Sequence, residues 1–375
     1  MSNDRYIHWL GLALTPNLGA RSMGKLLRQF GGPEQVFAAS LTELEAARLA
    51  APVAQAIHAR EALKAAEKEL AAARQLGVQL VHWDEPAYPP LLREIYDPPT
   101  LLYVRGKVEL LAQHMIGMVG TRRPTPYGNQ MAERLAHDLA ERGLVIASGL
   151  ARGIDSSSHK GALAAARGAT VGVLGTGVDV VYPKENRKLF AQMEERGAII
   201  SEFPIGTQPF PQNFPIRNRI VAGMSLGVIV VEGAQYSGSL ISARLAMEFN
   251  REVYGVPGNV TQPPSFAPNQ LIKQGAKLVT GWEDVVEELP TEIRAQLFPV
   301  EAPAAAERAS LFEQSLNETE KELFALLSAD QSRPVDEIVE LSGLNSSQVL
   351  ATLFELEMKG LVRQMPGKNF VKVLM

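Results

Sequence analysis

The chain has 375 residues, of which 46% are hydrophobic, and a formal net charge of -4. A chain of this length and apolar content is too large for one small domain, so we expect two or three. The lack of cysteine excludes disulfides, thiol nucleophiles and cysteine-ligated metal sites. The charge excludes a uniformly basic nucleic-acid coat, and no stretch approaches the ~18 apolar residues of a membrane span. We therefore expect a cytoplasmic protein without a membrane span.

Residues 1–77 have a helical, Ala- and Leu-rich pattern that predicts a small helical domain. The segment PNLGARSMGKLLRQFGG resembles a helix-hairpin-helix or SAM-like element, in which a glycine-containing turn lets backbone amides approach a phosphate or a partner. Such turns are also common in helical bundles. Simple helix packing is therefore the favoured interpretation, with DNA contact as the alternative.

Residues 78–298 alternate short β-rich runs with helical stretches, which predicts an α/β fold with a doubly wound, Rossmann-like core. Several of the predicted strands are apolar on both faces, as a sheet covered by helices on both sides requires. The strands are expected at Leu101–Val104, Met115–Val119, Leu144–Ser148, Thr170–Leu174, Ala198–Ser201, Val228–Val231 and Val253–Val256.

The last third of the chain contains a linker and a third domain. Residues 299–315 are rich in alanine, proline and charge and have no apolar period, which is typical of a linker. Residues 316–375 give three helices and then two strands around Pro366-Gly367, the outline of a winged helix. Acidic residues dominate its helical part, and only Met358–Met375 combines several cations with no acid. Duplex DNA binding and protein contact both remain open for this domain.

The strand MIGMV leads into GTRRPTPYG, and a glycine after a parallel strand is where an open α/β sheet binds its ligand. Gly120 permits close backbone approach, Thr121 offers a hydroxyl, and Arg122 can make charge-assisted hydrogen bonds to a phosphate. The glycine spacing does not fit the dinucleotide fingerprint, and no acidic residue ends the next strand to hold a ribose. A tight turn with solvated arginines is the alternative for this motif.

The next strand ends in SGLARGIDSSSHKGAL, where Ser148, Gly149, Arg152 and Gly153 form a tight loop before a helix. We expect the free amides of this loop and the helix dipole to bind an anion, with Arg152 adding formal charge. Asp155 is the expected N-cap of the helix, with a further role in orienting Arg152.

A hydrolase triad of Ser148, Asp155 and His159 is a competing interpretation of the same segment. Ser148 lacks a G-x-S-x-G elbow, and the one such pattern in the chain, Gly223–Gly227, precedes a strand where an elbow must follow one. We therefore expect His159 to make a polar contact beneath the loop, and we expect no catalytic residue.

The segment Phe203–Val231 contains two arginines and no acidic residue, which predicts a positively charged hollow. Arg217, Asn218 and Arg219 supply hydrogen-bond donors for phosphate oxygens, and Phe214 offers a ring on which a base can stack. Stacking on an aromatic ring is worth ~1–3 kcal/mol per base in single-strand binders. One aromatic ring among arginines therefore favours an unpaired strand over a duplex.

A third strand-to-helix junction lies in VVEGAQYSGSLISARLA, where Ser237 and Gly238 precede a helix. We expect this junction at the same sheet edge as the two loops above. Three phosphate-binding loops at one edge fit a string of phosphates, so the predicted ligand is a nucleic-acid strand with more than one nucleotide.

Together these segments strongly resemble the DprA/Smf family of DNA-processing proteins, and the matching motifs follow in order from about Tyr88 to Ala276. They include YPPLLREIYDPPTLLYVRG, GTGVDVVYPKENRKL, SEFP, FPIRNRI, VPGNV and NQLIKQGA in addition to the motifs above. The resemblance implies a protein that binds single-stranded DNA and loads the recombinase RecA in natural transformation. It implies no enzymatic reaction, and we expect no cofactor and no metal.

The resemblance also implies which residues contact DNA and which mediate self-association. The implied DNA pocket consists of Thr121, Arg122, Ser148, Gly149, Arg152, Gly153, Lys184, Phe214, Arg217, Asn218, Arg219, Ser237 and Gly238. Lys184, in YPKEN, enters through the resemblance alone. The segment SFAPNQLIKQGA is similar to a self-association segment, which implies a homodimer contact at Leu271, Ile272 and Leu278. Pro268 stands where the family usually has glycine, a departure that bears on the geometry of the dimer.

Two other functions stay open at the level of sequence. Rossmann-like phosphoribohydrolases have a PGGxGT-type loop with a catalytic Glu or Arg, whereas Glu232 stands in VVEGAQYSGS without that loop. A regulator that binds duplex DNA through the winged helix is the second alternative.

Overall fold

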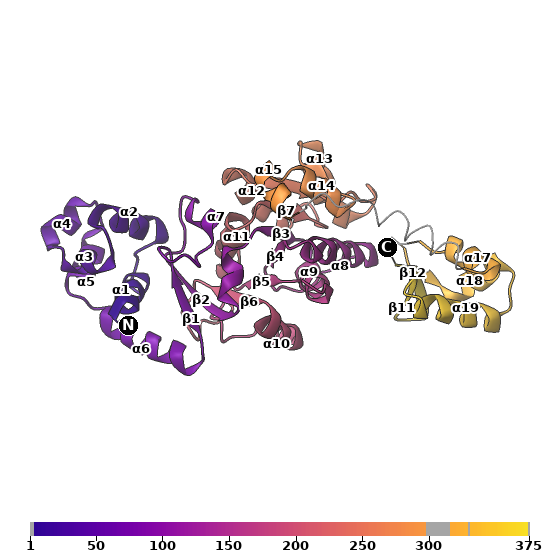
Figure 1. The fold of residues 1–375 in the computed structure, drawn as a ribbon, viewed down its shortest axis with the longest axis horizontal. Coiled ribbons are helices and arrows are strands. Elements are labelled where there is room, and N and C mark those ends of the chain that lie inside the picture. The colour runs from indigo at the N-terminus through magenta and orange to yellow at the C-terminus, as the bar shows by residue number, and fades with distance from the viewer. Residues whose placement is uncertain (1–3, 298–315, 329–330, 374–375) are drawn as a thin grey trace.

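The computed structural model describes residues 4–297, 316–328 and 331–373. In Figure 1 the N-terminal helices lie at one end, a large sheet with its covering helices in the middle, and a small helical unit with short strands at the other end. The predicted linker, residues 299–315, lies outside the described residues. Within the described ranges, no helix is both long and apolar enough to cross a membrane.

The first region consists of short helices that pack on one edge of the sheet. These are α1 (Asp4–Ala13), α2 (Ala20–Phe30), α3 (Pro33–Ala38), α4 (Leu41–Ala46), α5 (Ala51–His58) and α6 (Leu63–Gln75). Local signals set their ends: Ser40 forms a capping box with Glu43, and Gly31 ends α2 in the left-handed conformation. Trp9 and Leu26 are buried in the same hydrophobic core as Leu102 of the sheet. The predicted boundary near residue 77 falls between α6 and the first strand.

The central sheet has the strand order β1-β2-β6-β5-β4-β3-β7-β8-β9. Its strands are β1 (Gln79–His82), β2 (Leu101–Gly106), β3 (Met115–Val119), β4 (Val145–Ser148), β5 (Thr170–Val173), β6 (Ala198–Ser201), β7 (Gly227–Val230), β8 (Glu252–Gly255) and β9 (Lys277–Leu278). β1 and β2 pair antiparallel at one edge, and the strands from β6 to β9 are parallel. The predicted Rossmann-like core is confirmed, and each of the seven predicted strands is present with its ends displaced by at most two residues. β1 and the two-residue β9 were not predicted.

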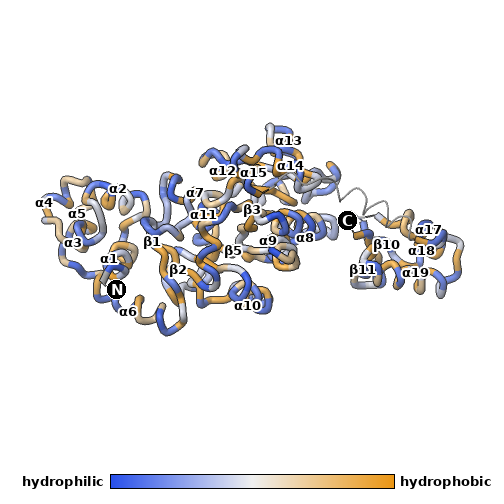
Figure 2. Tube along the Cα trace, in the orientation of Figure 1, coloured by the Kyte–Doolittle hydropathy of each residue, from blue (hydrophilic) through white to orange (hydrophobic). Residues whose placement is uncertain are grey.

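Helices cover both faces of this sheet. They are α7 (Pro90–Arg93), α8 (Pro126–Glu141), α9 (Ile154–Ala164), α10 (Arg187–Arg196), α11 (Asn213–Gly223), α12 (Ser239–Glu248), α13 (Phe266–Lys273), α14 (Trp282–Glu287) and α15 (Thr291–Leu297). Successive residues of one strand enter different hydrophobic clusters, as Met118 and Val119 do in β3. Both faces are therefore buried, and Figure 2 shows the apolar strands in the middle of the molecule.

The strand order reverses between β3 and β7. From β3 the chain proceeds through β4, β5 and β6 on one side, and then returns to β7 on the other side of β3. The loops that follow β3 and β7 consequently leave in opposite directions, and a crevice opens at the carboxyl ends of the strands. This crevice is the place where an open α/β sheet binds a ligand.

The C-terminal unit is a winged helix, as predicted. It contains α17 (Glu318–Leu326), β10 (Arg333–Pro334), α18 (Val335–Ser342), α19 (Ser346–Met358), β11 (Val362–Met365) and β12 (Asn369–Lys372). The two long strands pair antiparallel around the predicted turn, where Gly367 has a φ of 83° that favours glycine. Its apolar side chains, such as Ile338 and Leu353, form a core of their own.

Candidate nucleic-acid interface

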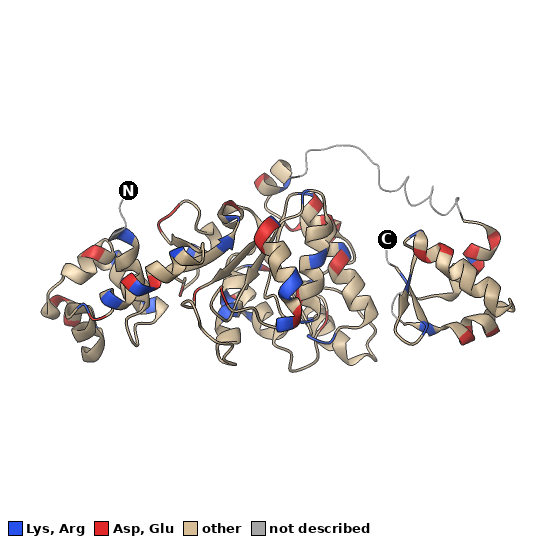
Figure 3. Ribbon diagram, turned by 90° about the horizontal axis from the view of Figure 1, so that it is seen from below, with Lys and Arg blue, Asp and Glu red and all other residues tan. Residues whose placement is uncertain are grey.

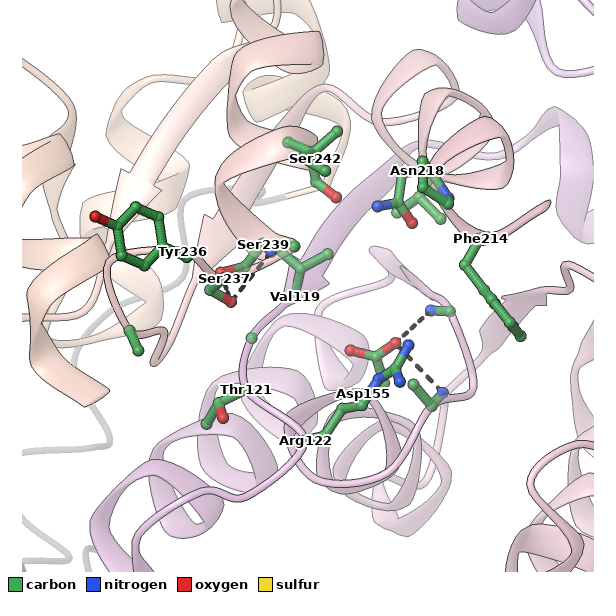
Figure 4. A pocket seen from close by; sticks show the side chains of 18 of the residues that line it. Val119, Thr121, Arg122, Asp155, Phe214, Asn218, Tyr236, Ser237, Ser239 and Ser242 are labelled. Carbon is green, nitrogen blue, oxygen red and sulfur yellow. Dashed lines mark hydrogen bonds between the residues drawn. The ribbon is translucent and has the colours of Figure 1, made fainter. Parts of the chain in front are cut away.

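A cavity of about 910 Å³ lies at the switch point of the sheet. We call it the sheet-edge pocket. Figure 4 shows side chains from β3, α9, α11 and α12 converging on it. Its lining contains the cations Arg122, Arg123 and Arg217 and one carboxylate, that of Asp155. The pocket is therefore concave, mixed polar and apolar, and positively charged, which suits an anionic ligand with flat apolar groups.

The loop after β3 supplies the first predicted contacts. The Arg122 guanidinium carbon lies 5.8 Å from the centre of the Phe214 ring, and Arg122 forms no ion pair within the described residues. The Thr121 hydroxyl accepts a hydrogen bond from the Arg123 amide at 3.2 Å. That hydroxyl proton remains available to a ligand, as does the whole guanidinium of Arg122.

The loop after β4 differs from its prediction in three respects. The Ser148 hydroxyl donates to the Met118 carbonyl at 2.6 Å, so it ties two strands together and does not line the pocket. The Asp155 carboxylate accepts from the amides of Gly149, at 3.1 Å, and Ala151, at 3.3 Å. These amides, predicted to bind an anion, are therefore already occupied by an internal carboxylate. Gly153, with a φ of 73°, is the N-cap of α9 in place of the predicted Asp155.

Arg217 is the cation closest to this loop. A Cβ at Gly149 would lie only 1.6 Å from an Arg217 terminal nitrogen, so glycine is required for the guanidinium to rest on the loop. Burial raises the pKa of Asp155, and the nearby Arg217 opposes that rise. Arg217 is only 5% exposed, and its Nε has no hydrogen-bond partner in the described structure. A buried donor in that state is a place for a ligand oxygen.

Arg219 is placed elsewhere, which corrects its assignment to DNA. Its Nε lies 3.3 Å from Asp97, and an Nη2 proton is donated to the partly buried Glu202 at 2.5 Å. The side chain is buried, does not line the sheet-edge pocket, and joins α11 to two other segments of the core. Asn218, the residue before it, does line the pocket.

Arg152 lies beside one end of the pocket, whereas Lys184 lies outside its lining. Arg152 forms a bidentate ion pair with Glu185 and lines a narrow cavity that opens beside Arg122 and Phe214. It therefore does not pair with Asp155, the residue predicted to orient it. Lys184 is exposed and belongs to neither lining, so its role stays a prediction.

The aromatic lining is larger than the single predicted ring. Tyr182 lies 5.5 Å from Phe214 between ring centres, in a tilted arrangement. Tyr236, which is 93% exposed, and Phe266 line the pocket as well. In Figure 4 Tyr236 and Phe214 lie on opposite sides of Arg122. Sequence reasoning missed Tyr182 and Tyr236 although each stands within a motif, because a tyrosine in a loop has no periodic signal.

The β7–α12 junction meets its prediction. Ser237 and Gly238 line the pocket at the N-terminus of α12, with Ser239 as the first helical residue. The Ser237 and Ser239 hydroxyls lie 2.8 Å apart and share a hydrogen bond. The positive end of the helix dipole and two hydroxyls therefore face the cavity, an arrangement that binds phosphate oxygens.

The candidate acid–base residues are engaged in structural contacts. Glu232 accepts hydrogen bonds from the amide and the hydroxyl of Thr125, at 2.9 and 2.5 Å, at the start of α8. The Nδ1 of buried His159 lies 2.6 Å from the Thr170 hydroxyl, and burial lowers the pKa of His159 to about 3. His159 thus makes the polar contact predicted beneath the loop, and it does not hydrogen-bond to Ser148 or Asp155 as a triad would require.

The three residues implied in self-association differ in exposure. Leu271 is buried inside the hydrophobic core of its own chain, so it is not available to a second copy, and this corrects its assignment. Ile272 is half-buried, and Leu278 is exposed on β9 at the sheet edge. Leu278 is therefore the best placed of the three for a contact between chains.

The winged helix is poorly equipped to bind phosphates. Of the four cations in Met358–Met375, Lys359 pairs with Glu320 at 2.5 Å and Lys372 lies 3.9 Å from the Phe324 ring. Arg363 lies 3.7 Å from Glu133 of α8. Figure 3 shows acidic residues along the helices of this unit. Three of the four cations in this segment therefore already have partners, and duplex DNA binding by the winged helix stays untested.

Two protein families match consecutive parts of the chain. The family described as DNA recombination-mediator protein A matches residues 79–290, and the DprA winged helix domain matches residues 301–368. The DNA processing protein DprA of Bacillus subtilis is 45% identical over 222 residues, covering 59% of this chain and 74% of the relative. The protein Smf of Escherichia coli is 39% identical over 307 residues, covering 81% and 80%.

Solved structures give the same result. The structure of DprA from Streptococcus pneumoniae has a TM-score of 0.68 and 34% identity, covering 76% of this chain and 98% of that chain. A structure concerned with the single-stranded DNA binding mode of DNA processing protein A from Helicobacter pylori has a TM-score of 0.51 and 31% identity, covering 56% and 94%. With the family match spanning more than half of its residues, this chain belongs to the DprA/Smf family of DNA-processing proteins.

Proposed function

We propose that this protein binds single-stranded DNA in the sheet-edge pocket and performs no chemical reaction on it. The observation that carries the proposal is the pair of unsatisfied cations: Arg122 has no ion-pair partner in the described chain, and Arg217 has a buried Nε without a hydrogen bond. Both face one cavity whose other side is the N-terminus of α12. The similarity to the Helicobacter pylori protein supports the same ligand.

Unpaired bases are the expected partners of the aromatic lining. Phe214 and Tyr236 occupy opposite sides of the pocket, and a base stacks on such a ring only when it is not paired in a duplex. Phosphates then lie along Arg122, Arg217 and the α12 N-terminus between these rings. This division of the lining supports single strands over duplexes.

The absence of chemistry in this proposal rests on the acid–base residues. Glu232 accepts hydrogen bonds from Thr125, the N-cap of α8, and His159 is held neutral beneath β5, so neither lines the sheet-edge pocket. Asp155 lines the pocket, but two backbone amides and the nearby Arg217 fix its carboxylate in place. No nucleophile is paired with a base among these groups.

The further role we propose is recombination mediation during natural transformation. In this role the protein covers incoming single strands, self-associates through the edge that carries Leu278, and presents the strand to the recombinase RecA. Family membership supports the role, and the exposed Leu278 on the edge strand β9 supports self-association.

Replacing one arginine tests the proposal. Arg122→Ala should weaken binding of a fluorescent oligo-dT by about tenfold or more, because a charge-assisted phosphate contact is lost. Arg167→Ala is the matched control, since this exposed arginine precedes β5. It therefore lies at the amino-terminal end of the strands, whereas the pocket lies at their carboxyl ends. Fluorescence anisotropy measures both affinities, and circular dichroism checks the fold. Equal affinities for the two variants would overturn the proposal.

A further inference from the structure

The narrow end of the sheet-edge pocket collects three guanidinium groups. Arg122, Arg152 and Arg217 line one small cavity beside the Gly149 backbone. Arg217 is only 5% exposed, and its Nε lacks a hydrogen-bond partner in the described structure. Three arginines around one cavity form a site for a phosphate group, in which planar donors meet oxygens on several sides.

Arg152 differs from the other two in how it is held. Its Nε and Nη2 both donate to the Glu185 carboxylate, the latter at 2.9 Å, in a bidentate pair. Both side chains are about half exposed, 55% for Arg152 and 52% for Glu185. The pair is therefore formed in a solvated position, where an ion pair contributes little and exchanges readily. Glu185 itself does not line the cavity.

A bound phosphate would require the same donors. A carboxylate and a phosphate both prefer the parallel N–H groups of a guanidinium, and one edge cannot satisfy both at full strength. The Glu185 charge also lies close to the position that a phosphate oxygen would take beside Arg152. Since the carboxylate is half exposed, it can turn into water when a phosphate replaces it.

We propose that Glu185 is a built-in competitor that occupies Arg152 until a DNA phosphate displaces it. This inference rests on the proposed function, because the competing ligand is a phosphodiester of a single strand. It assigns Glu185 a competing role that acts through Arg152. A bound strand is then held by Arg122, by Arg217 and by an Arg152 that Glu185 also contacts. The affinity is lower and release is faster than they would be if Glu185 did not compete for Arg152.

Four variants of the full chain test the competition. Glu185→Gln keeps the size and one acceptor of the side chain and removes its charge. Arg152→Ala removes the contested cation, and the double variant Arg152→Ala/Glu185→Gln completes a cycle. Glu195→Gln is the matched control, because Glu195 is an exposed glutamate on the neighbouring α10 and its substitution makes the same change in net charge.

The probe is a fluorescein-labelled oligo-dT of about 20 nucleotides, titrated over a salt series by anisotropy. We expect Glu185→Gln to bind about two- to fivefold more tightly than the unsubstituted chain, the range of an exposed ion pair. We also expect a steeper salt dependence, by up to ~0.7 in the log–log slope, because one more phosphate is fully neutralised. Glu195→Gln should leave both quantities unchanged.

The cycle separates competition from its alternatives. The gain from Glu185→Gln should vanish in the Arg152→Ala background, since no contested cation remains. A gain of equal size in that background would mean general charge repulsion, and a loss of affinity in Glu185→Gln would mean that Glu185 orients Arg152. Either result overturns the inference, as would equal gains in Glu185→Gln and Glu195→Gln. If the unsubstituted chain does not bind oligo-dT, the proposed function itself fails.

Discussion

The sheet-edge pocket and the exposed face of α19 in the winged helix present opposite chemistry. The pocket leaves Arg122 without an ion-pair partner in the described chain and surrounds it with aromatic rings. The α19 face instead exposes Leu350, Phe354 and Met358, which recur every four residues on one side of the helix, and has no cation among them. Both regions belong to folds that bind nucleic acids in other proteins. The difference shows that the placement of charged side chains, and not the fold, determines which of the two regions is suited to bind a phosphate.

The central domain and the winged helix also differ in how much an ion pair stabilises them. This difference gives the largest expected effect, a change in the free energy of unfolding. Arg219→Met should lower the free energy of unfolding by about 3–5 kcal/mol, because the partly buried Glu202 and Asp97 lose their buried cation. Lys359→Met should cost less, about 1 kcal/mol, since Lys359 is partly exposed and the buried Glu320 still accepts a hydrogen bond from the Asn317 amide.

Urea unfolding separates these effects, because the chain's three tryptophans, at positions 9, 83 and 282, all precede the winged helix. Tryptophan fluorescence should therefore report the Arg219→Met change and miss the Lys359→Met change, which circular dichroism would detect. If Arg219→Met unfolds at the same urea concentration as the unsubstituted chain, Arg219 is not a structural cation, and its assignment to DNA regains support.

Aromatic residues of the pocket and of the α19 face should differ in their effect on DNA affinity, and this effect is smaller in free energy. Phe214→Ala should weaken oligo-dT binding by about 1–3 kcal/mol, the value of one base stacked on a ring. Phe354→Ala, on the exposed face of α19, should leave the affinity unchanged. Anisotropy titrations at one salt concentration measure both variants. An equal loss in the two would show that the winged helix shares the single strand with the pocket.

Acidification through the ordinary pKa range of histidine should weaken the core and spare the winged helix, which has no histidine between residues 316 and 375. Burial lowers the pKa of His159 from its ordinary 6.5 to about 3, so the unfolded chain takes up this proton first as the pH falls. Stability from the neutral histidine is complete above about pH 6.5 and is lost toward pH 3, by about 1 kcal/mol per pH unit.

Urea unfolding detected by tryptophan fluorescence measures this loss of stability. The measurements run from about pH 7 to about pH 4, on either side of the ordinary histidine pKa. His159→Gln should flatten the pH dependence, because an amide does not titrate and can still donate to Thr170. The same slope in both proteins would assign the acid sensitivity to other groups.

The fold was predictable from sequence because its signals are local and repeated. Short apolar runs such as Met115–Val119 alternate with helical stretches, and a strand buried on both faces has few other interpretations. The location of the pocket followed from the same pattern, since ligands of open α/β sheets lie at the carboxyl ends of the strands. Arg122, Phe214, Arg217 and Ser237 were therefore placed correctly in its lining.

The errors concern partners that are remote in sequence. Nothing near Arg219 indicates that Asp97 and Glu202 fold against it, and an acid-free segment is not an acid-free environment. Ser148 stands in a glycine-rich loop like a ligand-binding hydroxyl, yet its rotamer points toward the Met118 carbonyl of the neighbouring strand. Side-chain direction and distant ion pairs are set by tertiary packing, which one sequence does not reveal.

The most direct test of the account compares single-stranded with duplex DNA in competition for the full chain. Labelled oligo-dT is bound first, and unlabelled single strand or duplex of equal length is then added to the unsubstituted protein, to Arg122→Ala and to Arg363→Ala. We predict that the single strand competes at least about tenfold better than the duplex, and that only Arg122→Ala loses affinity. A duplex that competes equally well, together with a greater loss in Arg363→Ala, would contradict the account and assign DNA binding to the winged helix.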